Sequence, residues 1–240
     1  MEEDRICGAN AVTALFVRRP DAAKRLFYTA AMKEMAGPLC AVMAKQRRPY
    51  RLLSDDDLAK AAGSIHHGGI AVVAAPRRVE IIDFVRPPKM ALLVILDRVS
   101  NPHNLGAIAR SAAFFGAGGL LFHEVPGQAF PSDAAYRTAE GGLEHLELHK
   151  TRNLPKALAA LEPHYRTVAA TLTADAMPLQ TLPRDRPIAL VLGNEEIGIS
   201  VSAAEACRRR VRILGAGPVQ SLNVAQAAAV LLAALTNPVA

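Results

Sequence analysis

Two polar residues that could act together on a ligand follow the apolar segment ALLVILD, residues 91–97. Asn104 and Arg110 stand six residues apart in a segment of helical character, with Gly106 between them. An amide and a guanidinium can hold a hydroxyl or a phosphate, and glycine lets a ligand or a neighbouring strand approach the backbone. We expect both side chains near the loop-facing end of this helix. Taken alone, the same residues are also explained as a helix cap and a surface charge.

Two later segments can also be explained either as ligand-binding residues or as ordinary helix ends. In LVLGNEEIGIS, Gly193 ends an apolar segment and is followed by Asn194 and Glu195, which resembles part of a nucleotide or cofactor loop. In ILGAGPVQSLNVAQAAA, Ser221 and Asn223 stand at the start of an alanine-rich helix, where free N–H groups can hold a ligand. The structural alternatives are helix N-terminal acids in the first segment and an N-cap at Ser221 in the second.

Common cofactor and metal motifs are absent from the sequence. There is no GxxxxGK[ST] loop and no GxGxxG loop, which disfavours an α/β oxidoreductase with a dinucleotide cofactor. His66 and His67 lie in a glycine turn without Cys or carboxylate partners at ligand spacing, so no metal is expected. The three widely separated cysteines predict neither a zinc site nor a disulfide framework.

The polar segments need a scaffold that brings strand ends together. Between residues 90 and 237, apolar strand candidates alternate with helix-compatible segments. This order predicts an α/β fold with a mostly parallel sheet and helices on both faces. Ligands of such sheets bind outside the carboxyl ends of the strands, where all three polar segments lie. We expect strands at the following segments: ALLVILD, GLLF, HLEL, RTVAAT, IALVLG and VRIL.

A small α/β domain is expected to precede this sheet, at residues 1–80. Ser54 before three acids predicts a helix N-terminus, and HHGGIAVVAAP predicts a glycine turn and a strand. Proline residues bracket a linker, taken as 81–90, although VEIIDFV could add a strand of its own. Residues 91–240 are expected to form the larger domain.

The charge balance indicates a polyanionic partner. The chain has a net charge of +6, and residues 1–89 hold 15 of its 28 basic but only 10 of its 22 acidic residues. Several basic clusters favour RNA or DNA, although any one cluster is also explained as a solvated helix face. The low aromatic content, 5%, does not suggest a base-stacking platform. We expect RNA-binding side chains at Arg18, Arg19, Lys45, Arg47 and Arg48.

Composition also disfavours disordered and membrane proteins. Hydrophobic residues make up 51% of the chain, enough for a substantial core. The longest apolar segment, VAQAAAVLLAAL, is too short to span a bilayer, and the acidic start MEEDR does not look like a secretory signal. We therefore expect a cytoplasmic protein with no membrane contact.

Together, the three polar segments carry a family resemblance. N-x-G-x-x-x-R after a strand, then L-G-N-E-x-x-G, then S-L-N-V resemble the three motifs of the SpoU/TrmH family, ribose 2′-O-methyltransferases of the SPOUT superfamily. This match runs from Leu92 to about Leu235. ICGANAVTALF and HHGGIAVV also look like the small substrate-binding domain that many members carry, so the resemblance covers nearly the whole chain.

The resemblance implies an S-adenosylmethionine-dependent enzyme that methylates a ribose 2′-hydroxyl in RNA. It also implies a C-terminal trefoil knot that holds the cofactor, and a homodimer formed through the knot helices. The matching cofactor-binding positions are Gly193, Ile213 and Leu222, with Leu192, Asn194 and Gly198 beside them. The matching active-site positions are Asn104, Arg110, Glu195, Ser221 and Asn223.

Within this family the motif-one arginine, here Arg110, is held to remove the hydroxyl proton together with an RNA phosphate. A guanidinium pKa stays above about 12, so a neutral arginine is costly. We expect Arg110 instead to anchor a phosphate and stabilise the developing alkoxide. Ser221 and Asn223 would orient the ribose or the loop, and Glu195 would hold Asn104 or Arg110.

Two positions depart from the family pattern. The Ile-Pro-Met common in motif three is replaced after Ile213 by Leu214 and Gly215, which could reshape the cofactor loop, and Asn101 stands where many relatives have an acid. The intact active-site positions disfavour a non-catalytic RNA-binding protein on the same scaffold. Among substrates, the basic excess of the appended domain favours rRNA, with tRNA as the alternative.

Overall fold

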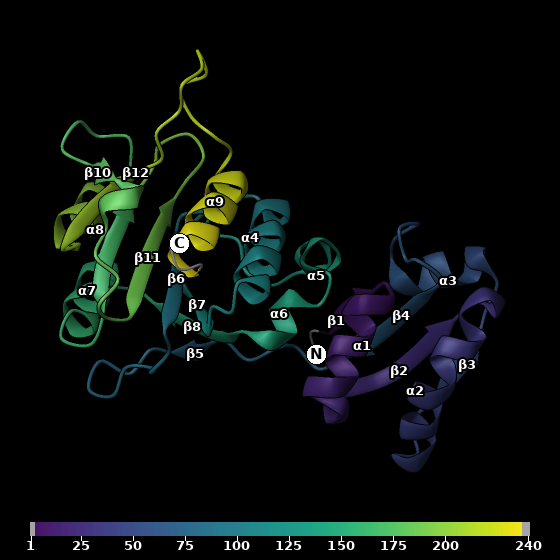
Figure 1. The fold of residues 1–240 in the computed structure, drawn as a ribbon. Coiled ribbons are helices and arrows are strands. Elements are labelled where there is room, and N and C mark those ends of the chain that lie inside the picture. The colour runs from purple at the N-terminus through teal and green to yellow at the C-terminus, as the bar shows by residue number, and fades with distance from the viewer. Residues whose placement is uncertain (1–2, 237–240) are drawn as a thin grey trace.

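The computed structural model describes residues 3–236, which form two sheets with their helices (Figure 1). The smaller sheet is N-terminal and has the strand order β1-β4-β2-β3. Its strands are β1 (Asp4–Cys7), β2 (Ala23–Tyr28), β3 (Tyr50–Leu52) and β4 (Ile70–Ala74). Its helices are α1 (Ala9–Arg18), α2 (Lys33–Lys45) and α3 (Asp55–Ala62), with 3-10 turns at Pro20–Ala22 and Ala30–Met32. The N-terminus predicted at Ser54 is confirmed, because its hydroxyl oxygen accepts a hydrogen bond from the Asp57 amide.

The two faces of the small sheet are covered unequally. Successive strand residues point to opposite faces. One face, which carries Ile6, Leu26 and Val72, packs in the main hydrophobic core with α1 and α2. The other face carries Cys7 and Ala71, which pack against α3. Since α3 has only eight residues, it covers only part of this second face.

The larger sheet consists of eight parallel strands within the described residues, in the order β10-β12-β9-β11-β6-β7-β8-β5. Its strands are β5 (Glu80–Ile81), β6 (Leu92–Asp97), β7 (Gly119–His123), β8 (Glu147–Thr151), β9 (Arg166–Ala170), β10 (Met177–Pro178), β11 (Ile188–Gly193) and β12 (Arg209–Arg212). A 3-10 turn at Leu179–Thr181 follows β10.

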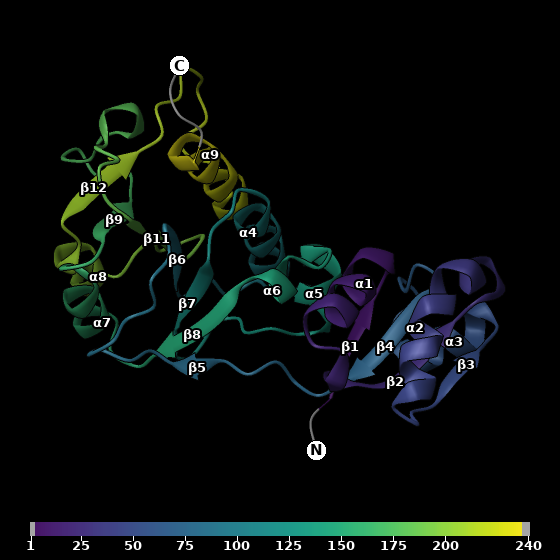
Figure 2. The ribbon, with the colours of Figure 1, turned by 60° about the horizontal axis from the view of Figure 1, so that its bottom comes forward.

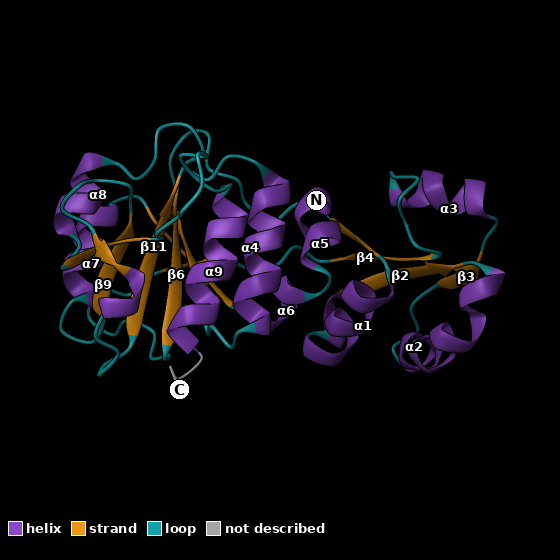
Figure 3. Ribbon diagram, turned by 45° about the horizontal axis from the view of Figure 1, so that its top comes forward, coloured by secondary structure: helices purple, strands orange, loops and turns teal. Residues whose placement is uncertain are grey.

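Helices cover both faces of this sheet (Figure 3). One face packs against α4 (Pro102–Phe114), α5 (Asp133–Ala139), α6 (Gly142–His145) and α9 (Val224–Thr236). The other packs against α7 (Leu154–Leu161) and α8 (Val201–Ala206). The prediction of a mostly parallel sheet with helices on both faces is confirmed. The trefoil knot stays a prediction.

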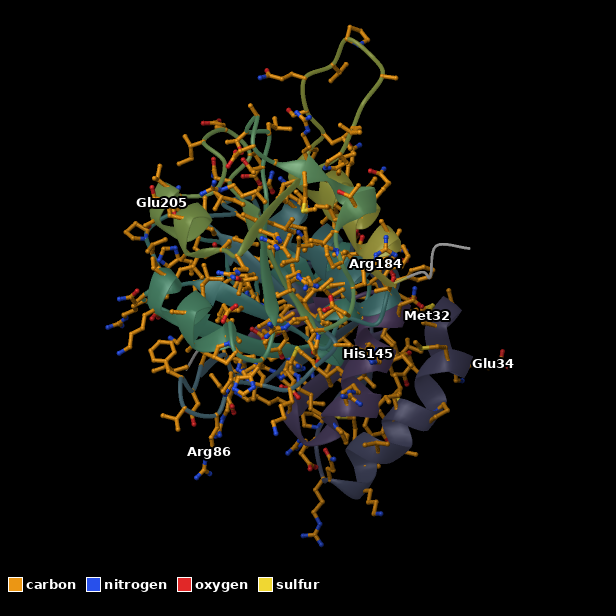
Figure 4. All side chains as sticks on the ribbon, turned by 60° about the vertical axis from the view of Figure 1, so that its left-hand side comes forward. Met32, Glu34, Arg86, His145, Arg184 and Glu205 are labelled. Atoms are coloured by element: carbon orange, nitrogen blue, oxygen red, sulfur yellow. The ribbon has the colours of Figure 1, made fainter. Side chains whose placement is uncertain are left out.

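Two expected strands are shifted. HLEL was expected to begin a strand, but His145 ends α6, so β8 begins at Glu147. The strand expected at VRIL ends at Arg212, so Ile213 and Leu214 lie in the loop that leads to α9. This loop projects from the molecule (Figure 4). The shift places Ile213 beside the sheet's carboxyl edge instead of within the sheet.

The segment expected as a linker is partly built into the large sheet. β5 pairs with β8, which confirms the strand suggested by VEIIDFV. The buried Tyr165 hydroxyl donates a hydrogen bond to the Pro88 carbonyl and accepts one from the Met90 amide at 3.0 Å. Arg86 lies between β5 and the segment that Tyr165 holds, and its side chain points away from the body of the protein (Figure 4).

A buried carboxylate joins the two parts of the chain, where α1 lies beside α5 and α6 (Figure 2). Glu144 of α6 is fully buried and accepts hydrogen bonds from Arg19 Nε and Arg77 Nη1, each at 2.8 Å. Asp4 of β1 lies 3.7 Å from Arg19 and accepts a hydrogen bond from the Tyr136 hydroxyl at 2.9 Å. These contacts, with the shared hydrophobic core, dock the small domain firmly on the large one.

This arrangement corrects two of the expected RNA contacts. The guanidinium of Arg19 is engaged with Glu144, and that of Arg48 donates to the carbonyls of Asp21 and Ala23. Both side chains therefore hold the fold, which sequence clusters alone do not reveal. The other three side chains are exposed, and their contact with RNA stays a prediction: Arg18, Lys45 and Arg47.

Replacing Glu144 by glutamine leaves Arg77 without its buried counter-charge and Arg19 with only Asp4, 3.7 Å away. Removing one partner of a buried ion pair costs about 3–5 kcal/mol. We therefore expect Glu144→Gln to lower the free energy of unfolding by that order in urea denaturation. The control is Glu140→Gln at the same interface, where an exposed carboxylate accepts a hydrogen bond from Asn10 and a loss below about 1 kcal/mol is expected. Equal losses in the two variants would contradict the role given to Glu144.

Candidate active site

One buried carboxylate joins three chain segments at the carboxyl edge of the large sheet. Asp97 ends β6, and its Oδ1 lies 2.8 Å from His123 Nδ1 at the end of β7. Its Oδ2 accepts hydrogen bonds from the Ser200 amide at 2.7 Å and the Ser200 hydroxyl at 2.6 Å. Burial by itself would raise the pKa of Asp97, but the hydrogen bonds from His123 and Ser200 outweigh it and hold the pKa below its ordinary value.

The loop after β11 is closed by its own residues. The Asn194 side chain accepts hydrogen bonds from two amides of the loop and donates one to the Arg98 carbonyl at 2.8 Å. A Cβ added to Gly193 would lie 2.3 Å from the Gly198 carbonyl carbon, so only glycine fits there. The side-chain groups of Asn194 are thus used within the protein, and its backbone N–H and C=O pair with Gly198, so its contact with a cofactor stays a prediction.

The starts of two helices carry the polar residues of the first and third segments. Asn101 caps α4 by accepting a hydrogen bond from the His103 amide at 2.8 Å, so the side chain of Asn104, inside the helix, does not serve as the cap. At α9, the side chain of Asn223 accepts a hydrogen bond from the Ala225 amide at 2.8 Å. The N-cap weighed for Ser221 therefore belongs to Asn223.

Three of the five expected active-site residues form a hydrogen-bonded cluster. Asn223 Nδ2 donates to Asn104 Oδ1 at 3.2 Å, and Asn104 Nδ2 donates to Glu195 Oε1 at 2.5 Å. Each residue comes from a different polar segment. We call this set, Asn104, Glu195 and Asn223, the amide–carboxylate cluster. Of the two partners weighed for Glu195, the structure selects Asn104.

The other two expected residues are not in this cluster. Ser221 is exposed on the loop before α9. Arg110 is exposed in the middle of α4 and has no hydrogen bond or ion pair within residues 3–236. Six residues along a helix correspond to about 9 Å and a turn of about 240°, so Arg110 and Asn104 point in different directions. The expectation that both lie at the loop-facing end of the helix was wrong.

A cavity of about 860 Å³ lies beside the amide–carboxylate cluster. Glu195 and Ser221 line it. All six expected cofactor-binding residues also line it: Leu192, Gly193, Asn194, Gly198, Ile213 and Leu222. The sequence analysis missed residues 170–173 and Arg212, which form another wall. RTVAAT, which forms β9 and its end, contains no polar motif that would mark a site. Only the pairing of β9 with β11 shows that residues 170–173 lie beside the cavity.

The cavity suits a ligand with both apolar and cationic parts. Its volume falls in the range of small-molecule sites, about 300–1,000 Å³. Leu192, Ile213 and Leu222 offer apolar walls, and the carboxylates of Glu195 and Glu196 offer negative charge. S-adenosylmethionine, with an aromatic base and a sulfonium, fits this combination. A second cavity of about 510 Å³ lies at the amino ends of β6 and β11, away from the cluster.

Two other kinds of site are absent from the described part of the chain. Within residues 3–236, no group of three or more His, Cys, Asp or Glu side chains could hold a metal ion. The same residues include no helix long and apolar enough to cross a membrane.

Comparisons with known proteins match both parts of the chain. Residues 91–233 match the model of the SpoU rRNA Methylase family, and residues 5–79 match the model described as RNA 2′-O ribose methyltransferase substrate binding. YfiF of Escherichia coli, named an uncharacterized tRNA/rRNA methyltransferase, is 33% identical over 233 residues. That alignment covers 96% of this chain and 67% of YfiF.

A second relative and a solved structure agree with these matches. The 23S rRNA (guanosine-2′-O-)-methyltransferase RlmB of Acinetobacter baylyi is 33% identical over 187 residues, covering 75% of this chain and 74% of RlmB. The crystal structure of an AdoMet-bound rRNA methyltransferase from Sinorhizobium meliloti superposes with a TM-score of 0.80 at 22% identity, covering 97% of this chain and 86% of that one. This structural likeness concerns the fold.

The low pKa of Asp97 predicts how stability depends on pH. A carboxylate whose folded pKa lies below its unfolded value, 3.8, contributes stability that is present above that value and lost as pH falls through the folded pKa. We expect Asp97→Asn to lower the free energy of unfolding by about 3 kcal/mol at pH 7 and to flatten its decline below about pH 4. Urea unfolding between pH 7 and pH 3 measures both effects.

The control for this prediction is Asp185→Asn. Asp185 also has a lowered pKa, caused first by its hydrogen bond with Arg166, but its side chain is largely exposed. The same acid decline in Asp97→Asn and in the unsubstituted protein would contradict the role given to Asp97.

Proposed function

Because the chain belongs to the SpoU rRNA methylase family, we propose that it is an S-adenosylmethionine-dependent RNA methyltransferase that modifies a ribose 2′-hydroxyl, most favourably in rRNA. The observation that carries the proposal is the amide–carboxylate cluster beside the 860 Å³ cavity. The likeness to RlmB and the match of the N-terminal part to a substrate-binding model support rRNA as the substrate. A tRNA substrate is the alternative, supported by the likeness to YfiF.

The cavity walls would hold S-adenosylmethionine, which supplies an electrophilic methyl group. Leu192, Ile213 and Leu222 would pack against its apolar parts, and the loop backbone near Gly193 would meet its polar atoms. Glu195 and Glu196 would favour its positive charges. After Ile213, the exposed Leu214 and Gly215 stand at the cavity lip where the family commonly continues with Pro and Met.

The amide–carboxylate cluster would orient the ribose hydroxyl. A hydroxyl is a weak nucleophile, so its alignment with the methyl group accounts for much of the rate. Asn104 is oriented from two sides, since Asn223 donates to its oxygen and Glu195 accepts from its nitrogen. Its second N–H remains available to donate to the ribose oxygen and to stabilise the charge that develops there.

Arg110 would contribute a fixed positive charge. Its guanidinium keeps its proton, so it would anchor an RNA phosphate near the reacting ribose. Arg110 lies on an exposed face of α4 that also carries Phe114, 81% exposed, and the adjacent α9 exposes Val230. We propose that two copies of the chain pair across this face, which would bury both apolar side chains and bring Arg110 to the subunit boundary.

The proposed reaction predicts which substitutions remove activity. Asn104→Ala is expected to reduce methyl transfer about 10²–10³-fold, because a donor to the developing charge is lost, and Arg110→Ala is expected to reduce it strongly as well. The assay follows radiolabelled methyl transfer to unmodified rRNA and tRNA, with the product identified as alkali-resistant 2′-O-methyl dinucleotide. Arg86→Ala removes an equivalent charge from a solvent-directed side chain and should leave the rate unchanged (Figure 4). Label in a base would refute ribose methylation.

The proposed dimer predicts a change of mass. Phe114→Glu would bring a charge into the apolar contact, so we expect it to shift the protein from dimer to monomer in size-exclusion chromatography with light scattering. Val17→Glu is the control, because Val17 is 69% exposed on α1, away from this face. A monomeric unsubstituted protein would refute the dimer without touching the proposed reaction.

A further inference from the structure

Three arginines share the partly covered face of the small sheet. Directly paired residues of neighbouring strands lie on the same face. Arg5 of β1 pairs with Val73 of β4, which pairs on its other side with Arg25 of β2. One row further, Phe27 of β2 pairs with Arg51 of β3. We call this set, Arg5, Arg25 and Arg51, the arginine face.

These side chains reach solvent because α3 is too short to cover them. α3 packs over the row that holds Cys7, Ala71 and Phe27. The arginine side chains lie around it: those of Arg5 and Arg25 are 49% and 46% exposed, and Arg51 is exposed on the edge strand. The opposite face of the sheet is covered by α1 and α2.

The positive charge of this face is only partly compensated. Glu3 pairs with Arg25 but also with Lys24 at 3.2 Å, so one carboxylate serves two cations. Arg5 lies 3.9 Å from Asp133. The side chain of Arg51 has no hydrogen bond or ion pair with any residue between 3 and 236. Planar guanidiniums in such a setting suit phosphate oxygens, which they can bind in pairs of hydrogen bonds.

Acidic residues mark one boundary of this surface. Asp55 and Asp56 begin α3, just beyond the end of β3. Their charge disfavours a phosphate backbone at that end of the sheet. The favourable direction therefore leads the other way, from Arg51 across Arg25 to Arg5 and the large domain.

The arginine face lies on the side of the molecule where the active site opens. In Figure 3, α3 and the loops at the carboxyl edge of the large sheet point to the same side, whereas α1 and α2 lie on the other. α2 ends at Lys45, followed by Arg47, so these expected RNA contacts lie away from the active-site side.

The surface between the two regions continues through α5. Asp133, the partner of Arg5, begins α5, and Thr138 near its end lies 3.1 Å from His103 Nδ1. His103 precedes Asn104 of the amide–carboxylate cluster.

We propose that the arginine face binds the phosphate backbone of the RNA whose ribose is held at the amide–carboxylate cluster. This inference rests on the proposed function and assigns its RNA contacts to Arg5, Arg25 and Arg51 in place of Lys45 and Arg47. Phosphate contacts set the register of the RNA and carry no sequence information directly. The arginine face therefore positions the substrate and leaves its sequence to be read elsewhere.

Two double variants that remove the same charge test the proposal. Arg25→Ala with Arg51→Ala removes two charges from the arginine face, and Lys45→Ala with Arg47→Ala removes two from the far side. Each full-length variant is titrated with a labelled, unmodified rRNA transcript over a range of salt concentrations. We expect the first pair to weaken binding at least tenfold and to reduce the salt slope by about 1.4–1.8, because each phosphate contact contributes about 0.7–0.9. The second pair should change neither.

Further measurements separate this proposal from the proposed function. S-adenosylmethionine affinity should be unchanged in the Arg25 and Arg51 variant, whereas methyl transfer at subsaturating RNA should fall in proportion to the lost RNA affinity. Arg51→Ala alone serves as a second variant, since it removes no internal partner and leaves folding intact. Equal or larger losses in the Lys45 and Arg47 variant, or no loss in either, would overturn the arginine face. Absence of methyl transfer in the unsubstituted protein, with RNA binding retained, would instead refute the proposed function.

Discussion

The candidate active site at the carboxyl edge of the large sheet depends on the hydrogen bonds that the ionised, buried carboxylate of Asp97 accepts. The loop of residues 194–200 is anchored at both ends to adjacent residues of one chain segment. Asn194 donates a hydrogen bond to Arg98, and Ser200 donates two to Asp97. Glu195 lies between these anchors, so its carboxylate is presented at a defined place. Loops at strand ends are usually mobile, and two anchors on adjacent residues remove most of that freedom.

At the start of α9, one side chain also makes two structural contacts. Asn223 uses its side-chain oxygen to cap α9 and its nitrogen to contact Asn104. The preceding loop is exposed, with Leu214 and Val219 at 55% and 77% exposure. The cluster is therefore held by α4, the N-terminus of α9 and an anchored loop, while another wall of the cavity carries exposed apolar side chains. Such a division keeps the reacting groups preorganised without requiring a rigid entrance.

Much of this site could be predicted from the sequence, because its residues occur in local motifs at strand ends. Asn104, Glu195 and Asn223 were found in this way, and the parallel sheet explains why they meet. The buried ion pair of Arg19 could not be predicted in this way, because its partner Glu144 lies 125 residues away and burial at an interface leaves no local sequence signal. The predicted position of Arg110 was wrong because a residue six positions after Asn104 in a helix lies further along it and points in another direction.

The docking of the small domain has a consequence for how RNA is used. A flexibly tethered domain would have to be brought into position for each binding event, at an entropic cost that grows with the length of the tether. The buried contact of Glu144 with Arg19 and Arg77 removes that cost in advance. Under the proposed function, contacts made to RNA on the small domain would contribute to aligning one ribose at the cluster, and binding free energy gained far from the reacting atoms would serve their orientation. The same rigidity fixes the path between the two regions, so an RNA that fits one region but not the other binds without being aligned.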